Sequence, residues 1–91
     1  MNLYTQLVSQ IIKDQESIIG PVALEQARKV DGLEIIDINS IKINGDAKIV
    51  ISALVEQYAI LFGRASVEIC KEAVLESKPQ LPKEDLPEIL R

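Results

Sequence analysis

Histidine is absent from this chain of 91 residues, and cysteine occurs once, at position 70. Histidine is the commonest general base and the commonest metal ligand, so its absence removes Ser-His and Cys-His nucleophiles, and a zinc site is effectively excluded. Cys70 lies at helical spacing from Val67 and Val74, which is typical of a small buried residue. We therefore expect it to pack in a core rather than to react, and we expect neither catalytic residues nor a metal.

Glycine is sparse, and each of its four residues stands alone at the edge of a predicted element. Neither of the glycine-rich patterns that cradle phosphate groups occurs in the chain, so we expect no cofactor. The pair Gly20-Pro21 has two interpretations, an anion site at a helix start or a corner between two helices. Because no further glycine accompanies the pair, we prefer the corner.

Aromatic residues make up 3% of the chain, and ten scattered Lys and Arg residues face fourteen Asp and Glu residues, for a net charge of −4. Proteins that bind nucleic acids concentrate basic residues on one face, and many stack bases on aromatic side chains. Both features are missing. The sequence therefore predicts no nucleic-acid partner.

Long hydrophobic runs are also missing. Glu56 and Gln57 interrupt the best candidate, which falls short of the roughly 20 apolar residues of a membrane-spanning helix. The first residues lack the basic and apolar regions of a signal peptide, and one cysteine is unlike the disulfide-rich small secreted domains. We expect a cytoplasmic chain with no membrane partner.

Aliphatic residues are abundant, and hydrophobic residues in total make up 47% of the chain. Over residues 3–19 they recur at the i, i+4 and i+7 positions of an amphipathic helix. Residues 22–31 predict a second, shorter helix, for which Gly32 is a suitable C-terminal stop. Both helices present one apolar face, so both need a partner to pack against.

Residues 33–44 change to the alternation and β-branched content of strands. We expect strands over 33–37 and 40–44, paired as an antiparallel hairpin. The alternation slips between Ile35 and Ile36, which predicts a bulge or a tight turn there.

Residues 48–62 carry apolar side chains on two adjoining stripes, which is typical of a central helix. An alternative interpretation makes Asn44-Gly45 a hairpin turn and residues 48–52 a third strand. We prefer the helix, because the spacing of three and four continues to Phe62. A last helix is predicted over residues 64–77.

Together these elements predict a mostly helical α+β fold in the order helix, helix, strand, strand, helix, helix, with a small antiparallel hairpin packed on helices. Residues 1–77 are expected to form one compact domain, and residues 78–91 a proline-containing, extended C-terminal tail. Three prolines exclude a regular helix through the tail, although Pro82 can open a single turn. Because the tail is rich in aliphatic residues, we favour a docked tail over a disordered one.

Glu68, Glu72 and Glu76 recur every four residues and are predicted to share one face of the last helix. Such a row binds a cation or a basic partner, or it is an ordinary solvated face. We prefer the solvated face, because a run of charges usually needs no explanation beyond solubility.

With catalytic chemistry missing and aliphatic residues in plenty, we interpret the chain as a non-enzymatic protein-interaction or regulatory module that forms a homodimer or binds another protein. The expected contact residues lie on the central helix and the tail: Ile51, Val55, Phe62, Leu81, Leu86, Ile89 and Leu90. One alternative is a small domain that binds an apolar ligand in a pocket between hairpin and helices. Another is a histidine-free enzyme, which a cluster of shifted titratable groups in a cleft would indicate.

Overall fold

The first helix, α1 (Leu3–Ile19), confirms the predicted range. The computed structural model describes residues 2–77 and 79–91, so Met1 and Lys78 lie outside the described residues. Asn2 caps α1 by accepting a hydrogen bond from the backbone N–H of Thr5 at 2.9 Å. The cap satisfies one of the amide groups that the start of a helix leaves unpaired.

The second helix, α2 (Val22–Ala27), follows α1 at a sharp corner. Gly20 ends α1 with a φ of 77°, in the left-handed region that glycine adopts without steric cost. The predicted corner is confirmed. The helix ends earlier than expected because the N–H groups of Lys29 and Val30 bond to carbonyls three residues back, which tightens the chain into turns.

Strands β1 (Leu33–Asp37) and β2 (Ser40–Ile43) form an antiparallel pair. Their register shifts between Ile35 and Asp37, so one residue of β1 has no partner in the ladder. The predicted slip is therefore confirmed as a bulge, which turns the side chain of Ile36 out to solvent.

Helices α3 (Ala47–Phe62) and α4 (Arg64–Glu76) follow the hairpin. The Asp46 carboxylate caps α3 by accepting N–H bonds from its first turn, the shorter at 2.9 Å. The predicted helix is confirmed, and the alternative third strand over residues 48–52 is wrong. Gly63, with a φ of 82°, separates α3 from α4.

The tail contains two short 3₁₀ helices, Lys83–Asp85 and Glu88–Leu90, each of which starts directly after a proline. The single turn predicted at Pro82 is confirmed. The tail folds back on the domain, and its three leucines, Leu81, Leu86 and Leu90, join the hydrophobic core. The expected boundary between domain and tail falls at residue 78, outside the described residues.

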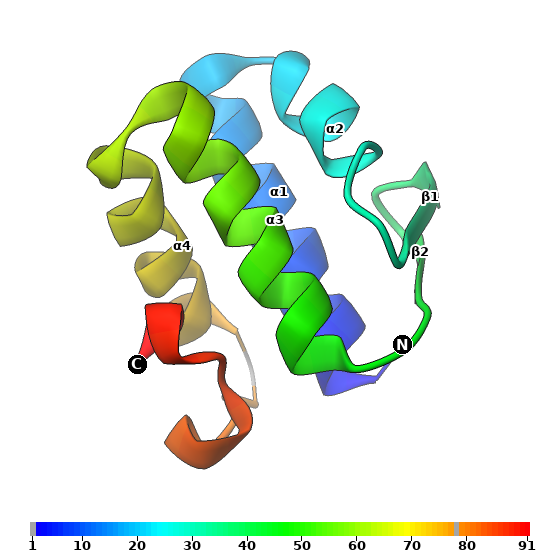
Figure 1. The fold of residues 1–91 in the computed structure, drawn as a ribbon, viewed down its shortest axis with the longest axis vertical. Coiled ribbons are helices and arrows are strands. Elements are labelled where there is room, and N and C mark those ends of the chain that lie inside the picture. Colours follow the sequence, from blue (N-terminus) through cyan, green and yellow to red (C-terminus); the bar gives the residue numbers. More distant parts are fainter. Residues whose placement is uncertain (1, 78) are drawn as a thin grey trace.

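The helices pack in a simple arrangement (Figure 1). Helix α1 packs against α4 and α2, and α3 packs against α4 and α2, with the hairpin on the side of the molecule away from α4. The core lies where these helices meet, and its largest fully buried side chains are Tyr58, Leu7, Ile11, Ile12, Ile51, Leu54, Gln15, Val8, Val55 and Cys70. The protein has a mostly helical α+β fold with a small antiparallel hairpin, as the sequence predicts.

Candidate functional site

Two of the predicted contact residues lie inside the molecule. Ile51 and Val55 on α3 are 0% exposed, in a helix that packs against α4, α2 and the last turn of the tail. They belong to the hydrophobic core of this chain. A partner of the folded protein therefore has no access to either side chain, and any contact surface lies elsewhere.

The predicted contact residues of the tail are also turned inward. Leu81, Leu86 and Leu90 are buried in the core, and Ile89 is half-buried against it. The leucine side chains thus stabilise the chain's own fold, at roughly 1.5–3 kcal/mol for each fully buried side chain. A partner can reach only the tail residues that surround these leucines.

Two polar side chains from outside the tail and one from the tail itself hold the tail backbone in place. The Tyr4 hydroxyl donates to the Asp85 carbonyl oxygen at 3.0 Å, and the Lys48 ammonium donates to the Glu84 carbonyl oxygen at 2.6 Å. The Arg91 guanidinium donates to two tail carbonyl oxygens. These bonds satisfy carbonyl groups that the irregular tail leaves without a ladder or helix partner.

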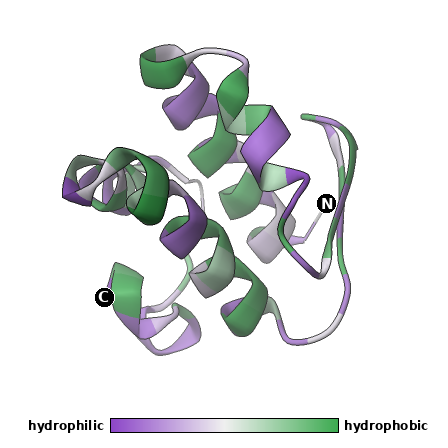
Figure 2. Ribbon diagram, turned by 45° about the horizontal axis from the view of Figure 1, so that its top comes forward, coloured by the Kyte–Doolittle hydropathy of each residue, from purple (hydrophilic) through white to green (hydrophobic). Residues whose placement is uncertain are grey.

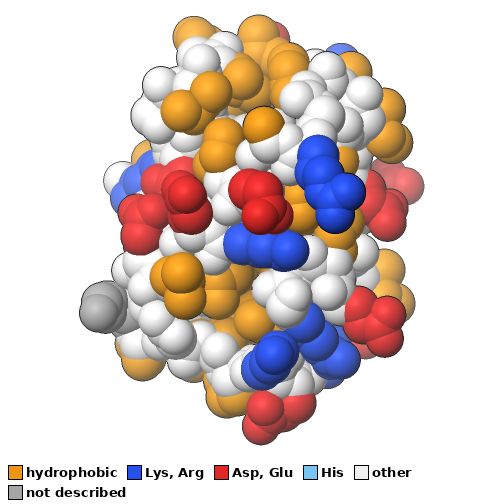
Figure 3. All heavy atoms as spheres, turned by 90° about the vertical axis from the view of Figure 1, so that its left-hand side faces the viewer, with side chains coloured by type: hydrophobic (Ala, Val, Ile, Leu, Met, Phe, Trp, Pro, Cys, Tyr) orange, Lys and Arg blue, Asp and Glu red, His pale blue; other side chains and the backbone are white. Residues whose placement is uncertain are grey.

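Phe62, in contrast, is partly exposed, and it lies at an end of the molecule that is rich in apolar side chains. We call this surface the corner patch and define it by four exposed residues: Ile18, Val22, Leu61 and Phe62. They come from the end of α1, the start of α2 and the end of α3. Figure 2 shows that hydrophobic and hydrophilic stretches alternate along the helices. The upper end of the face in Figure 3 shows hydrophobic side chains gathered there.

Hydrogen bonds hold the helix ends of the corner patch together. The Gln15 amide donates to the Ser66 carbonyl oxygen at 3.0 Å, which joins the end of α1 to the start of α4. The Tyr58 hydroxyl donates to the Ala23 carbonyl oxygen at 2.6 Å, which joins α3 to α2. The patch is therefore built on rigid elements, a favourable base for a binding surface.

Sequence reasoning found Phe62 and missed its three neighbours, although a signal for them was present. Ile18 and Leu61 continue apolar stripes that are buried in the middle of α1 and α3. Both stand within two residues of a glycine corner, at Gly20 and Gly63. At such a corner the chain turns away, so the last apolar residue before it is left without a neighbouring helix to cover it and stays exposed.

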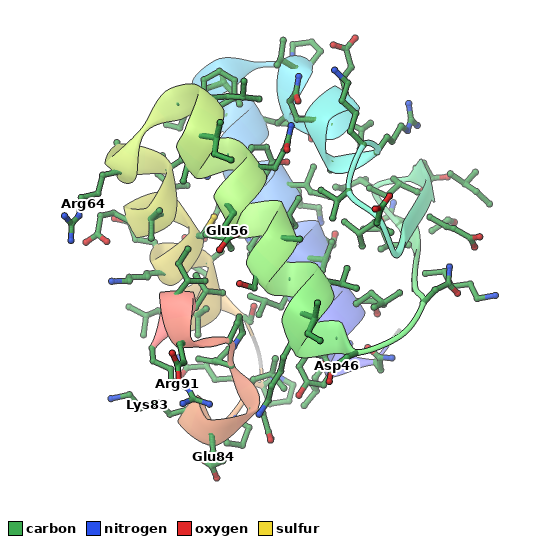
Figure 4. All side chains as sticks on the ribbon, viewed as in Figure 1. Asp46, Glu56, Arg64, Lys83, Glu84 and Arg91 are labelled. Atoms are coloured by element: carbon green, nitrogen blue, oxygen red, sulfur yellow. The ribbon has the colours of Figure 1, made fainter. Side chains whose placement is uncertain are left out.

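A hollow lies between α4 and the tail. We call it the tail groove, with a volume of about 290 Å³, and it is lined by Lys71, Val74, Leu75, Gln80, Leu81, Lys83, Leu86, Leu90 and Arg91. Its floor is aliphatic and its three charged residues are all basic, in a chain with a net charge of −4. Figure 4 shows that Lys83 and Arg91 lie on the tail, at the end of α4 away from Arg64.

A polar cleft of about 350 Å³ lies between α1, the hairpin turn and the end of α4. The Gln10 amide group donates to the Asp14 carboxylate at 3.0 Å and to the Glu76 carboxylate at 3.4 Å, so it sits between two acids. The charge of Asp14, followed by burial, raises the pKa of Glu76.

The row of acids on α4 does not face one environment. Glu68 forms an ion pair with Lys71 at 3.4 Å, while Glu76 meets α1 through Gln10. Both acids are exposed. Among residues 2–77 and 79–91, no group of three His, Cys, Asp or Glu side chains is arranged to hold a metal ion.

Cys70 lies in the core between α1 and α4, fully buried. Burial raises the pKa of its thiol to about 11, although a hydrogen bond from the Gln15 amide at 3.5 Å acts in the opposite direction. A thiol in this state is almost entirely protonated near neutral pH, and it is therefore a weak nucleophile.

The space between hairpin and helices, where an apolar ligand was one alternative, holds side chains of the chain itself. Leu33 and Ile41 of the hairpin are buried in the common core. The Ser9 hydroxyl of α1 donates to the Ile38 carbonyl oxygen at 3.0 Å, so hairpin and helix touch directly.

None of the helices that the structure describes combines the length and the apolarity that crossing a membrane requires. No protein-family model matches the chain, and the searches of curated proteins and of solved structures found no match either.

Proposed function

We propose that this chain is a non-enzymatic interaction module that self-associates through the corner patch. The observation that carries the proposal is four exposed apolar side chains on three helix ends that lie toward the same end of the molecule (Figure 1). Single exposed apolar residues are ordinary on a protein surface, whereas contiguous apolar patches mark interaction sites.

The composition of the corner patch favours a second copy as its occupant. In a two-fold dimer the same surface meets itself, so a charge near the axis meets a like charge. The four residues of the patch carry no charge, and self-association meets no such repulsion. Phe62 supplies an aromatic residue of the kind that is enriched at interfaces.

We leave the tail leucines out of this interface, because their side chains are buried in the core of the chain itself. A chain that stops after Ser77 would lose three buried leucines, so its behaviour would mix loss of the fold with loss of the interface. Point substitutions on the surface separate the two. We also place the module in the cytoplasm, since a lone cysteine fits a reducing compartment.

The test is light scattering on a sizing column over a dilution series. We expect a dimer that dissociates on dilution, and we expect Ile18→Ser and Phe62→Ser each to weaken it about tenfold, the effect of a contact worth about 1.4 kcal/mol. The matched control is Ile36→Ser on the hairpin, at 80% exposure against 66% for Ile18, which should leave the dimer unchanged. A monomer at every concentration, or an equal loss in the control, would overturn the proposal.

A further inference from the structure

We propose that the tail groove binds an acidic, leucine-bearing peptide segment of a partner protein. The inference is independent of the corner patch, which lies at the other end of α4. It rests on the shape of the groove, the aliphatic floor and the sign of the charges around it.

The floor of the groove is built for an apolar anchor. Leu81, Leu86 and Leu90 form a buried base, while Leu75 on α4 stands beside them at 65% exposure. A partner side chain that packs against Leu75 removes its apolar surface from water, which contributes roughly 25 cal/mol for each Å² buried. A volume of about 290 Å³ suits one or two such side chains.

The rim of the groove selects the charge of its occupant. Lys71 on α4 and Lys83 and Arg91 on the tail line the groove, and the lining contains no acid. A cationic rim favours acidic groups beside the apolar anchor and disfavours basic ones, and it also steers an acidic segment during encounter. Figure 3 shows basic side chains below and above a band of hydrophobic ones on this face.

The existing contacts of these cations leave them able to bind. The Arg91 guanidinium uses its Nε–H for the Leu86 carbonyl oxygen at 3.0 Å and an Nη2–H for the Glu84 carbonyl oxygen at 3.3 Å. Two of its five donors are thereby used, and these bonds fix the group at the rim. The pair of Lys71 with Glu68 is exposed on both sides, and such pairs are weak.

The openness of the groove favours a peptide over a small molecule. Sites for small molecules enclose most of the ligand surface, whereas Leu75 remains largely exposed at this groove. A side chain presented by a larger partner needs only a shallow seat, because the flanking contacts of the partner exclude water around it.

The experiment is a nuclear magnetic resonance titration of the full ¹⁵N-labelled chain with three synthetic peptides of equal length. The first peptide carries leucines flanked by Asp and Glu, the second carries the same leucines with Lys in place of the acids, and the third keeps the acids and has Ala in place of the leucines. We expect saturable shifts only with the first peptide, centred on the amides of Val74, Leu75 and Leu81.

Substitutions then test the rim and the floor. We expect Lys83→Glu to weaken the acidic peptide about fivefold and to gain binding of the lysine peptide, since one exposed charge pair contributes up to about 1 kcal/mol. Leu75→Ala, at an exposed position that the fold tolerates, should weaken it further. Lys42→Glu on the exposed hairpin is the matched control and should change nothing.

Four results would overturn the proposal. Equal binding of the acidic and lysine peptides would show that the rim does not select charge, and shifts centred outside the groove would place the site elsewhere. Absence of binding to the acidic peptide, with binding of phosphatidylserine vesicles that Lys83→Glu abolishes, would make the groove a contact for anionic lipid. Absence of both would leave the groove without a ligand of this class.

Discussion

The Tyr58 hydroxyl donates a hydrogen bond to the Ala23 carbonyl oxygen, 2.6 Å away, and both residues are fully buried. The bond joins α3 to α2 across 35 positions of sequence. It also fixes the relative position of the helix ends that carry the corner patch. A tyrosine with so large a buried ring needs a partner for its hydroxyl, and here the partner is a backbone carbonyl.

We expect Tyr58→Phe to lower the free energy of unfolding by about 1–3 kcal/mol, because a buried carbonyl loses a hydrogen bond while the ring stays in place. Urea unfolding measures the change. The control is Tyr4→Phe. The Tyr4 hydroxyl donates to the Asp85 carbonyl oxygen at a half-buried site, so its loss should lower the free energy of unfolding less. A Tyr58→Phe protein as stable as the parent would contradict this account of the bond.

The Cys70 thiol should make stability depend on alkaline pH. Its pKa is about 11 in the folded chain against an ordinary value of 9.0, so between these values the unfolded chain releases a proton that the folded chain keeps. The stabilisation is therefore full below pH 9 and is lost as the pH rises to about 11, with a slope of at most about 1.4 kcal/mol per pH unit. Denaturation of the parent and of Cys70→Ala at several pH values measures the difference in slope.

Burial, followed by the charge of the Cys70 thiolate, also raises the pKa of Tyr58. The part due to burial is common to both proteins, whereas the part due to Cys70 is lost in Cys70→Ala and belongs to the difference in slope. The same burial predicts that a thiol reagent labels Cys70 slowly in the native protein and quickly in denaturant. If the two proteins lost stability with the same slope, the thiol would not be the group that titrates.

Gly32 should tolerate no side chain. Its φ is 90°, and a Cβ atom there would lie 2.7 Å from Val50 Cγ2 and 2.9 Å from the Asn44 carbonyl oxygen. Gly45 has a similar φ of 89° with open space around it, which makes it the matched control. We expect Gly45→Ala to cost about 1–2 kcal/mol from the left-handed backbone alone, and Gly32→Ala to cost clearly more, as measured by thermal unfolding. Equal losses would show that the steric contact relaxes freely.

Replacing Glu76 should stabilise the protein near neutral pH. The charge of Asp14, burial, a hydrogen bond with Asp14 and the charge of Glu72 together raise the pKa of Glu76, so the ionised group is disfavoured by the fold. For an acid whose pKa is raised on folding, stability is highest when the group is protonated and falls as the pH rises through its pKa. We expect Glu76→Gln to raise the melting temperature at neutral pH, with the gain vanishing in acid.

The control for this prediction is Glu68→Gln on the same helix, which removes the exposed ion pair with Lys71 and should bring no gain. A gain of equal size in both variants would point to the net charge of the chain rather than to the pair of acids in the polar cleft.

Much of the local structure was predictable because its causes are local. The range of α1 follows from its apolar spacing, and the bulge in β1 follows from the broken alternation at Ile35 and Ile36. Asp46 marks the start of α3 by a cap that needs only its own first turn. The corner at Gly20 likewise depends on backbone freedom that one residue supplies.

The candidate surfaces were less predictable. A helical stripe shows which residues share a face, but it does not show which face a neighbour covers. Ile51 and Val55 are buried in the core, in a helix that packs against α4, α2 and the tail, whereas Phe62 is partly exposed at the end of the same helix. The prolines of the tail predicted a broken chain, and they carried no information on where its leucines would pack.

The sequence by itself determined the absence of histidine chemistry, the α+β class and the position of most helix ends, because composition, periodicity and caps act within a few residues. Only the tertiary structure decided which aliphatic residues are surface. Burial depends on elements that are distant in the chain, and the ends of α1 and α3 lie at the same end of the molecule only once the helices have packed (Figure 1). For the same reason, the basic rim of the tail groove appears only when the tail docks beside α4.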